Sequence, residues 1–295
     1  MKSSRSLRDL IQYGANRLRG VQIESANLDA QLLAACVLGV SRTYVLIYPE
    51  LKLTPKQESE YMALIERRSL HEPVAYITGT CEFMSLAFAV DENVLIPRAD
   101  TETLVEAAIS EANSRGARRV LEIGTGSGCV AVSLAVNCPS LSVTAVDISP
   151  SALDVARANA QAHGVSRRVA FMQGDIFEDR LTDVLTVSGG FDMLVSNPPY
   201  ITAAEMAALV QSVRGFEPHT ALSGGQDGLM FYREIARRAP ALLNESAAVL
   251  LEIGCTQGGQ TRDIFNNFGN ISVLKDLTGK DRVLRADNIS IQKGL

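Results

Sequence analysis

Two short motifs in this 295-residue sequence combine residue types that could do chemistry. The first is Gly124-Thr125-Gly126-Ser127-Gly128, with Glu122 just before it and Asp147 further along the chain. The second is Asn197-Pro198-Pro199-Tyr200. Each motif directly follows an apolar run typical of a buried strand, and open α/β sheets bind ligands at such strand ends. We therefore expect the second motif to lie beside a ligand cleft built by the first.

The glycine-rich turn predicts a cofactor that contains a nucleoside. It lies between a predicted strand at 120–123 and a predicted helix at 129–136. Glycines permit a tight turn and a close backbone approach, and the start of the helix offers unpaired N–H groups. Asp147 follows the next predicted strand, where a carboxylate can accept hydrogen bonds from both hydroxyls of a ribose.

The kind of cofactor follows from what surrounds the turn. Cys129 stands where the dinucleotide pattern needs a third glycine, and the Gly-Lys-Ser/Thr of a P-loop is absent. Glu122 would repel a pyrophosphate but attract an ammonium or sulfonium group. The motif therefore favours S-adenosylmethionine, a cationic cofactor without phosphate, over an ordinary strand-to-helix turn with solubilising acids.

A further acid, Asp175, follows the third predicted strand within Gly174-Asp175-Ile176-Phe177. The adenine edge of the cofactor would lie there. The Asp175 carboxylate can accept the adenine amino group, and Ile176 or Phe177 can cover the ring. An aspartate in a surface turn explains the residue nearly as well.

The Asn-Pro-Pro-Tyr motif is suited to holding an amino or amide nitrogen. Pro198 and Pro199 fix φ and remove backbone donors, which leaves rigid carbonyl acceptors. The Asn197 side chain adds another carbonyl, and the Tyr200 ring offers a face for stacking. Convergent acceptors suit a planar –NH2 group, not a hydroxyl or thiol. The alternative is a proline-rich turn that merely ends a strand.

The elements that position these motifs alternate between strand and helix from about residue 100. Strands are expected at 120–123, 143–146, 169–172, 193–195, 247–253, 271–274 and 283–286, and helices at 129–136, 150–162 and 229–243. Repeated strand–helix units predict a mostly parallel sheet covered by helices. Earlier in the chain, Thr54-Pro55 and apolar residues at helical spacing predict helices. Short β-prone runs at 74–77, 86–90 and 94–96 separate the two regions.

Composition and charge limit the classes of protein. Hydrophobic residues make up 46% and charged residues 21%, as in globular chains, and the length favours two domains. The five scattered cysteines argue against a disulfide framework or zinc site and favour a reducing compartment. No apolar run is long enough for a membrane span, and the first residues lack the apolar stretch of a signal peptide. We expect a cytoplasmic chain that does not enter a membrane, although the basic first twenty residues would also suit an organelle-targeting segment.

The charge is unevenly distributed along the sequence. The chain has 28 Lys+Arg and 33 Asp+Glu, a net charge of −5. Residues 1–73 hold ten basic and eight acidic residues, a net of +2, which leaves −7 for the remainder. The net negative charge of the chain after residue 73 argues against binding nucleic acid through a large positive surface. The mildly basic region at 1–73 is either a docking surface for a protein substrate or a solvated helical face.

The motifs together resemble a known family. Asn197-Pro198-Pro199-Tyr200 is similar to the [DNS]-P-P-[YFW] motif of methyltransferases that act on DNA adenine, RNA guanine or protein glutamine. The rest of the chain resembles the release factor glutamine methyltransferase family. The matching residues are Glu72-Pro73, Tyr76-Ile77, Gly79, Glu82-Phe83, Val94-Leu95-Ile96-Pro97-Arg98, Asp100-Thr101-Glu102, Glu217-Pro218, Ala221-Leu222, Gly224-Gly225, Asp227-Gly228-Leu229, Tyr232-Arg233, Glu252-Ile253-Gly254, Gln257-Gly258, Asp276, Gly279 and Asp281-Arg282.

The chain departs from the usual family pattern at three places. Ala99 replaces a second proline, Met84-Ser85 stands where Trp-Gly is usual, and Ile176 stands where some members have Trp. These departures concern packing and adenine coverage, so they bear on cofactor affinity more than on methyl transfer.

The resemblance implies a fold and a domain organisation. The expected fold is α/β: a Rossmann-like class I methyltransferase sheet with helices on both faces, plus a small N-terminal helical domain joined by a β-hairpin linker. The expected boundaries are 1–73 for a substrate-docking domain, 74–96 for the linker and 97–295 for the methyltransferase domain.

The resemblance also implies an activity. Members of the family transfer a methyl group from S-adenosylmethionine to the side-chain amide nitrogen of the glutamine in the Gly-Gly-Gln loop of class 1 peptide chain release factors, leaving S-adenosylhomocysteine. The implied catalytic residues are Asn197, Pro198, Pro199 and Tyr200. The implied cofactor-binding residues are Glu122, Gly124, Thr125, Gly126, Ser127, Gly128, Asp147, Asp175, Ile176 and Asn197. We expect a monomer that needs no metal and forms no stable complex with nucleic acid.

Other functions remain open at this point. A DNA adenine or RNA guanine methyltransferase also presents its motif to an –NH2 group, but the first would have to flip a base and grip phosphates. A cofactor-binding module without catalysis would not require Asn197 and Pro198. The tripeptide Gly-Gly-Gln also occurs in this chain, at 224–226 and 258–260, and chance explains it better than automethylation or a pseudosubstrate loop.

Overall fold

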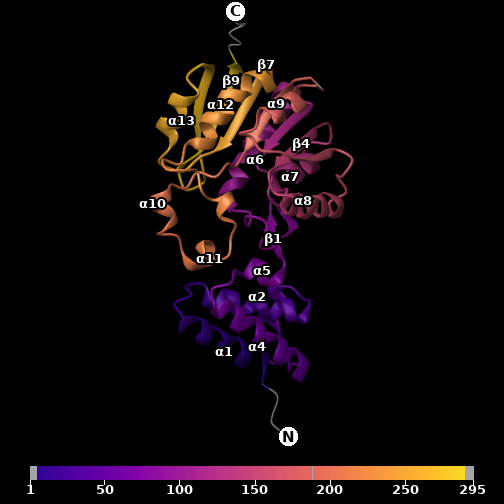
Figure 1. Ribbon diagram of the computed structural model, residues 1–295. Coiled ribbons are helices and arrows are strands. Elements are labelled where there is room, and N and C mark those ends of the chain that lie inside the picture. The colour runs from indigo at the N-terminus through magenta and orange to yellow at the C-terminus, as the bar shows by residue number, and fades with distance from the viewer. Residues whose placement is uncertain (1–4, 188, 290–295) are drawn as a thin grey trace, which may run out of the picture. The chain divides into compact units, whose positions relative to one another are not determined.

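The chain folds into two compact units. The computed structural model describes residues 5–187 and 189–289 (Figure 1). Unit 1 comprises Met1–Thr80 together with Val210–Phe216, and unit 2 comprises Cys81–Leu209 together with Glu217–Leu295. Among the described residues, no helix is long and apolar enough to cross a membrane. The boundaries 1–73, 74–96 and 97–295 stay a prediction.

Unit 1 is built from short helices around an apolar core of its own. Its helices are α1 (Leu7–Arg19), α2 (Ala26–Leu38), α3 (Arg42–Ile47), α4 (Pro55–Ser69), α5 (Val74–Thr78) and α11 (Gln211–Arg214). Thr54 caps α4 with its side chain and Pro55 opens that helix, as predicted. Leu10, Leu33 and Ile65 are fully buried in the core. The helical character predicted for this region is confirmed.

The β-prone run at 74–77 forms a helix instead, so that prediction was wrong. Pro73 and Gly79 frame five residues, and Gly79 ends the turn with a φ of +74°. The carbonyl of Pro73 accepts hydrogen bonds from the N–H groups of Tyr76 and Ile77. Ile77 is buried in the core of unit 1, and this tertiary packing outweighs the β propensity of the run.

The run at 94–96 forms no strand, which also differs from the prediction. Val94 and Ile96 are buried, so packing in the core, not strand pairing, explains why these residues are apolar. The Ile96 N–H donates to the Glu217 carboxylate over 3.2 Å, which replaces a strand partner. The expected hairpin is shorter than 74–96: β1 (Thr80–Phe83) pairs with β2 (Leu86–Ala89).

Unit 2 contains a seven-stranded sheet in the order β5-β4-β3-β6-β7-β9-β8. The strands are β3 (Arg119–Ile123), β4 (Ser142–Asp147), β5 (Val169–Gln173), β6 (Phe191–Ser196), β7 (Leu243–Glu252), β8 (Phe268–Lys275) and β9 (Asp281–Ile289). Neighbours from β5 to β7 pair in parallel, and β9 alone runs against both β7 and β8. The predicted Rossmann-like class I methyltransferase sheet is confirmed.

Helices cover both faces of this sheet (Figure 1). They are α6 (Ala99–Arg115), α7 (Cys129–Asn137), α8 (Pro150–Ala162), α9 (Asp179–Thr186), α12 (Met230–Leu242) and α13 (Gly258–Ile264), with shorter α10 (Ala203–Met206) and a 3-10 turn at His219–Ala221. Successive strand residues alternate between two cores. Val120 and Met193 pack with α6 and α7, whereas Leu121 and Leu194 pack with α9 and α12. Burial on both faces explains why these strands are continuously apolar.

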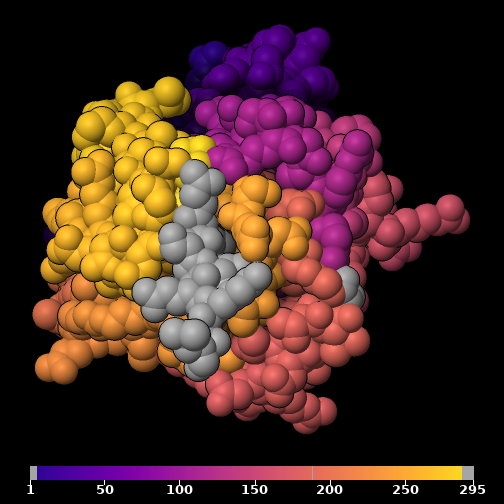
Figure 2. Space-filling view, turned by 90° about the horizontal axis from the view of Figure 1, so that it is seen from above, coloured from indigo at the N-terminus to yellow at the C-terminus, as the bar shows by residue number. Residues whose placement is uncertain are grey.

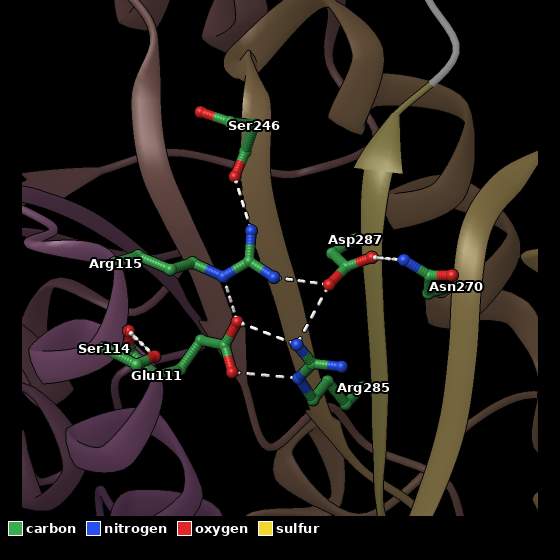
Figure 3. Close-up of polar contacts among 7 residues, drawn as sticks. All are labelled: Glu111, Ser114, Arg115, Ser246, Asn270, Arg285 and Asp287. Carbon is green, nitrogen blue, oxygen red and sulfur yellow. Dashed lines mark hydrogen bonds and ion pairs between the residues drawn. The ribbon is translucent and has the colours of Figure 1, made fainter.

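An ion network fastens the end of α6 to the sheet. Seen from above, magenta segments from the first half of the chain lie beside yellow segments near its C-terminal end (Figure 2). Glu111 accepts from Arg285 over 2.8 and 3.0 Å and also pairs with Arg115. Arg115 also forms an ion pair with Asp287 and donates to the Ser246 carbonyl over 2.8 Å (Figure 3). The network holds α6 from one end, and the other end of the helix reaches the candidate site.

Replacing Glu111 by Gln should lower the free energy of unfolding by roughly 1–3 kcal/mol, because the half-buried guanidinium groups of Arg115 and Arg285 both lose a carboxylate partner. Burial raises the pKa of Glu111, but hydrogen bonds from Arg285 and Arg115 outweigh it and hold the pKa below its ordinary 4.5. The folded state therefore binds this proton less tightly than the unfolded chain. The stabilisation should be present above pH 4.5 and be lost as the pH falls below it.

Denaturant unfolding at several pH values measures this effect. The matched control is Asp154→Asn, which breaks the exposed pair between Asp154 and Arg157 and should cost at most about 0.5 kcal/mol. Equal losses in the two variants would show that the Glu111 network does not hold α6.

Candidate active site

The predicted site residues lie along one edge of the unit 2 sheet. Ile123 at the end of β3 is in register with Ser196 of β6 on one side and Val146 of β4 on the other. Asp147 of β4 is in register with Gln173 at the end of β5. The order along the edge is therefore Asn197, the glycine turn, Asp147 and then the segment with Asp175. The structure brings all the predicted motifs to this edge.

Backbone hydrogen bonds to the neighbouring strand β4 hold the glycine turn in shape. The N–H groups of Gly124 and Thr125 both donate to the Val146 carbonyl, over 2.8 and 3.1 Å. Gly124, Gly126 and Gly128 have φ values of +74°, +53° and +78°, which side chains rarely adopt. Gly128 also has α8 against it, since an added Cβ would lie 3.0 Å from the Cβ of Ala156.

Glu122 is a buried carboxyl beneath the turn. It is 2% exposed and accepts a hydrogen bond from the Thr125 hydroxyl over 2.6 Å. Burial raises its pKa to about 8, and the nearby Asp147 adds to the shift. A cation bound beside the turn would favour the ionised carboxylate. Glu122 is therefore placed to recognise positive charge.

Asp147 keeps part of its hydrogen-bonding capacity for a ligand. Its two carboxylate oxygens accept the N–H groups of Gly126 and Ser149, over 2.8 and 2.9 Å. A carboxylate has about four acceptor positions, so each oxygen can accept one more hydrogen. These bonds orient the carboxylate for the ribose hydroxyls expected there.

The adenine-side residues differ in exposure. The Asp175 carboxylate accepts from the Phe177 N–H over 2.9 Å, which forms the local turn considered as the alternative. Ile176 is 4% exposed and packs into the core with Leu181. Phe177 is 40% exposed and meets Phe231 edge to face at 5.2 Å. Of the two apolar candidates, Phe177 has the more accessible ring.

Two buried polar atoms on this edge have no hydrogen-bond partner among the described residues. They are the hydroxyl of Ser127, which is 1% exposed, and Oε2 of Glu252, which is 1% exposed. Buried polar atoms are almost always paired in folded proteins. A ligand with polar groups at this edge would satisfy them, and with the buried acid Glu122 they fit a cationic nucleoside cofactor.

Asn197 and Pro198 present free acceptors at the end of β6. The Asn197 amide Nδ2 donates to the Thr101 hydroxyl over 3.2 Å. Across residues 5–187 and 189–289, no donor reaches the Oδ1 of Asn197 or the carbonyl of Pro198. Asn197 is half-buried and Pro198 is buried. Both predicted acceptors therefore have hydrogen-bonding capacity that the described residues do not use; their convergence on a substrate stays a prediction.

The glycine-rich segment around Gly224 packs against the backbone of Pro199 and Tyr200. An added Cβ on Gly224 would lie 2.7 Å from the Cα of Tyr200 and 2.8 Å from the Pro199 carbonyl. The amide of Gln257 donates to the carbonyls of Tyr200 and Gly228, over 3.1 and 3.3 Å. The motif thus rests on a close backbone contact that only glycine permits.

The first turn of α6 holds residues that sequence reasoning gave no role. Asp100 pairs with Arg282 at 2.8 Å, and Glu102 accepts from the Met84 N–H over 2.7 Å. Thr101 lies between them and contacts Asn197. Each of three consecutive residues therefore ties the helix to a different element.

Glu252 was also missed, although the sequence holds a signal for it. Leu121-Glu122-Ile123-Gly124 and Leu251-Glu252-Ile253-Gly254 repeat the same four letters at the ends of two strands. Both glutamates prove to be buried, and burial raises the pKa of Glu252 to about 7.

Known proteins are similar to this chain in sequence and in fold. Family models described as the PrmC N-terminal domain and the methyltransferase small domain match residues 9–79 and 99–215. A release factor glutamine methyltransferase from Chlorobaculum tepidum is 40% identical, over 89% of this chain and 90% of the relative. One from Geobacter sulfurreducens is 39% identical, over 95% of each chain. The chain belongs to the release factor glutamine methyltransferase family. The resemblance stated from the motifs is confirmed.

Membership shows that this chain is an S-adenosylmethionine-dependent methyltransferase. The solved structure of the hMettl16 catalytic domain in complex with MAT2A 3'UTR hairpin 6 is similar, with a TM-score of 0.54 and 14% identity. It covers 81% of this chain and 84% of that one, and it supports the fold alone.

Cofactor binding should release a proton from Glu122 near pH 7. Its pKa of about 8 keeps the ligand-free carboxyl mostly protonated, and a bound cation lowers that pKa. Calorimetry with S-adenosylmethionine in two buffers of different ionisation enthalpy measures the release. We expect Glu122→Gln to abolish the buffer dependence and to weaken binding roughly tenfold or more. Unchanged affinity and buffer dependence in that variant would contradict the role of Glu122.

Gly224→Ala should reduce turnover at least about tenfold, because the added methyl displaces the backbone at Pro199 and Tyr200. Steady-state methylation and thermal unfolding are measured together. The control is Gly259→Ala, whose added Cβ meets no atom within 4 Å. Full activity in Gly224→Ala would contradict the supporting role of this glycine.

Proposed function

We propose that this methyltransferase modifies the side-chain amide nitrogen of the glutamine in the Gly-Gly-Gln loop of class 1 peptide chain release factors. The observation that carries the proposal is the pair of free acceptors, Asn197 Oδ1 and the Pro198 carbonyl, beside the candidate cofactor turn. The names of the relatives from Chlorobaculum tepidum and Geobacter sulfurreducens point to the same substrate.

The two acceptors suit the chemistry of an amide. Its nitrogen is a weak nucleophile because its lone pair is delocalised into the carbonyl. Asn197 and Pro198 accept the two amide N–H bonds, orient the nitrogen and increase its electron density. When bound, S-adenosylmethionine supplies an electrophilic methyl group on a sulfonium centre and becomes S-adenosylhomocysteine. Positioning by the two acceptors then accounts for most of the rate.

The protonation states around the motif support transfer without a strong base or a covalent enzyme intermediate. Burial raises the pKa of Tyr200 well above its ordinary value, so the phenol keeps its proton near neutral pH. Burial raises the pKa of Cys129 to about 12, so this thiol is not a nucleophilic thiolate. The amide proton can leave after methyl transfer.

Unit 1 is the candidate for recognising the release factor. Large apolar side chains of α3 and the residue after it are exposed: Leu46 by 52%, Ile47 by 62% and Tyr48 by 50%. Exposed apolar groups that lie together are typical of protein-binding surfaces. We propose residues 1–73 as the docking domain, 74–96 as the linker and 97–295 as the catalytic domain of a cytoplasmic monomer.

The Gly-Gly-Gln at 224–226 has a structural explanation. Gly224 is required by its contact with Pro199 and Tyr200, and Gln226 is exposed. Packing therefore accounts for Gly224 without a pseudosubstrate role.

Measuring which of three acceptors becomes methylated tests the proposal. The protein is incubated with S-adenosylmethionine labelled in its methyl group and one of three acceptors: a purified release factor, its loop Gln→Ala variant or duplex DNA. Label should enter the release factor, be lost in the variant and be absent from DNA. Label on DNA but not on release factor would favour an adenine methyltransferase instead.

Asn197→Ala should lower kcat by a factor of about 100 or more, because one of the two amide acceptors is removed. Cofactor affinity, measured by calorimetry, should stay within about threefold of the wild-type value. Equal loss of turnover and of cofactor binding would contradict the assignment of Asn197 to the substrate.

A further inference from the structure

Two buried amide side chains of unit 2 make the same set of contacts. Asn159 lies in α8 and is 1% exposed, and Gln257 directly precedes α13 and is 7% exposed. Each amide nitrogen donates to two backbone carbonyls, and each amide oxygen accepts a backbone N–H. A buried amide costs free energy unless its donors and its acceptor are paired, and both side chains meet that condition.

Gln257 contacts the last residue of the Asn-Pro-Pro-Tyr motif. Its Nε2 donates to the carbonyls of Tyr200 and Gly228, over 3.1 and 3.3 Å. Its Oε1 accepts from the Gly254 N–H over 3.0 Å. A half-turn of the amide would place its oxygen against two carbonyls, so these contacts fix its orientation.

The Tyr200 carbonyl is an anchor for the chain after the two prolines. Pro198 and Pro199 lack an N–H, and in the part of the chain that the structure describes no donor reaches their carbonyls. On the other side of the motif, the pairing of β6 holds the chain at Ser196. Because φ is fixed at both prolines, an anchor at each end limits the directions that the Pro198 carbonyl can take.

Gln257 shares this anchor with the carbonyl of Leu222. The N–H of the peptide between Tyr200 and Ile201 donates to Leu222 over 3.0 Å, and the carbonyl of the same peptide accepts from Gln257. One hydrogen bond alone would let the peptide plane tilt about that bond. The two bonds together fix the plane.

Asn159 holds the glycine turn in the same way. Its Nδ2 donates to the carbonyls of Ser127 and Ala89, over 2.9 and 3.0 Å, and its Oδ1 accepts from the Ala89 N–H over 2.7 Å. The peptide between Ser127 and Gly128 is held on its other side as well, since its N–H donates to the Thr125 carbonyl over 2.8 Å. Asn159 therefore fixes a peptide plane inside the candidate cofactor turn.

We propose that Gln257 and Asn159 are positioning residues with separate effects: Gln257 aims the Pro198 carbonyl at the substrate amide, and Asn159 shapes the turn that receives S-adenosylmethionine. The part that concerns Gln257 rests on the proposed function and extends it to the residue that orients the acceptor. If the two amides served only stability, replacing either would lower the melting temperature without acting selectively on turnover or on cofactor binding.

Kinetics and calorimetry on two matched variants test the proposal. Gln257→Glu and Asn159→Asp keep the shape and the acceptor oxygen, but they replace each –NH2 by an oxygen that the two facing carbonyls repel. We expect Gln257→Glu to lower kcat for release factor methylation by about 10- to 100-fold, with cofactor affinity within about threefold of wild type. We expect Asn159→Asp to weaken cofactor binding about tenfold or more, with kcat at saturating cofactor within about threefold.

The same pattern of loss in both variants would overturn the proposal, as would wild-type values in either one. Melting temperatures identify a variant that fails to fold. Gln257→Met and Asn159→Leu then carry the comparison, because they remove the hydrogen bonds without burying a charge. They should show the same division between kcat and cofactor affinity.

A second measurement does not depend on turnover. In protein labelled with ¹³C at tyrosine carbonyls and with ¹⁵N at isoleucines, only the peptides Tyr76-Ile77 and Tyr200-Ile201 give a carbonyl–nitrogen correlation. We expect the Tyr200 carbonyl signal to move in Gln257→Met and to stay in place in Asn159→Leu. The Tyr76 signal is the internal reference and should stay in both variants. An unmoved Tyr200 signal in Gln257→Met would overturn the proposal.

The two measurements separate a failure of this proposal from a failure of the proposed function. If wild-type protein methylates no release factor, the proposed substrate fails. The Tyr200 carbonyl signal and the cofactor affinity of Asn159→Asp would still decide whether the two amides hold their motifs.

Discussion

Parallel pairing of neighbouring strands is the constraint on which this site depends. Because β3, β4, β6 and β7 run in the same direction, their last residues meet at one edge of the sheet. That edge gathers Glu122 and Asp147, which we propose contact the cofactor, the Asn-Pro-Pro-Tyr motif and the buried Glu252. The apolar cores on both faces fix the strands, and the strands fix the distances between these groups.

The site is built at a cost to stability. Glu122 and Glu252 are buried carboxyls whose pKa values are raised to about 8 and about 7. The folded protein binds these protons more tightly than the unfolded chain does. Ionisation of either group therefore destabilises the ligand-free fold as the pH rises from 4.5 through its raised value. A bound cation would offset part of that cost, so both acids are better explained by function than by stability.

Local sequence predicted much of this architecture. The glycine turn, the strand ends and the helix at 150–162 were readable because turn chemistry and apolar periodicity act over a few residues. The run at 74–77 was misread, since packing of Ile77 into the core of unit 1 outweighed its β propensity. The contact of Thr101 with Asn197 and the burial of Glu252 are seen only in the structure. Each lies far along the chain from Asn197, and a single sequence gives no sign that they lie at the same end of the sheet.

The account can be tested most directly by a crystal structure of the protein with S-adenosylhomocysteine and a peptide that contains Gly-Gly-Gln. The distances to measure run from the glutamine amide nitrogen to Asn197 Oδ1 and to the Pro198 carbonyl. Both should lie within about 3.2 Å, as hydrogen bonds require. A glutamine whose oxygen faces Asn197, or whose amide lies elsewhere, would contradict the central claim.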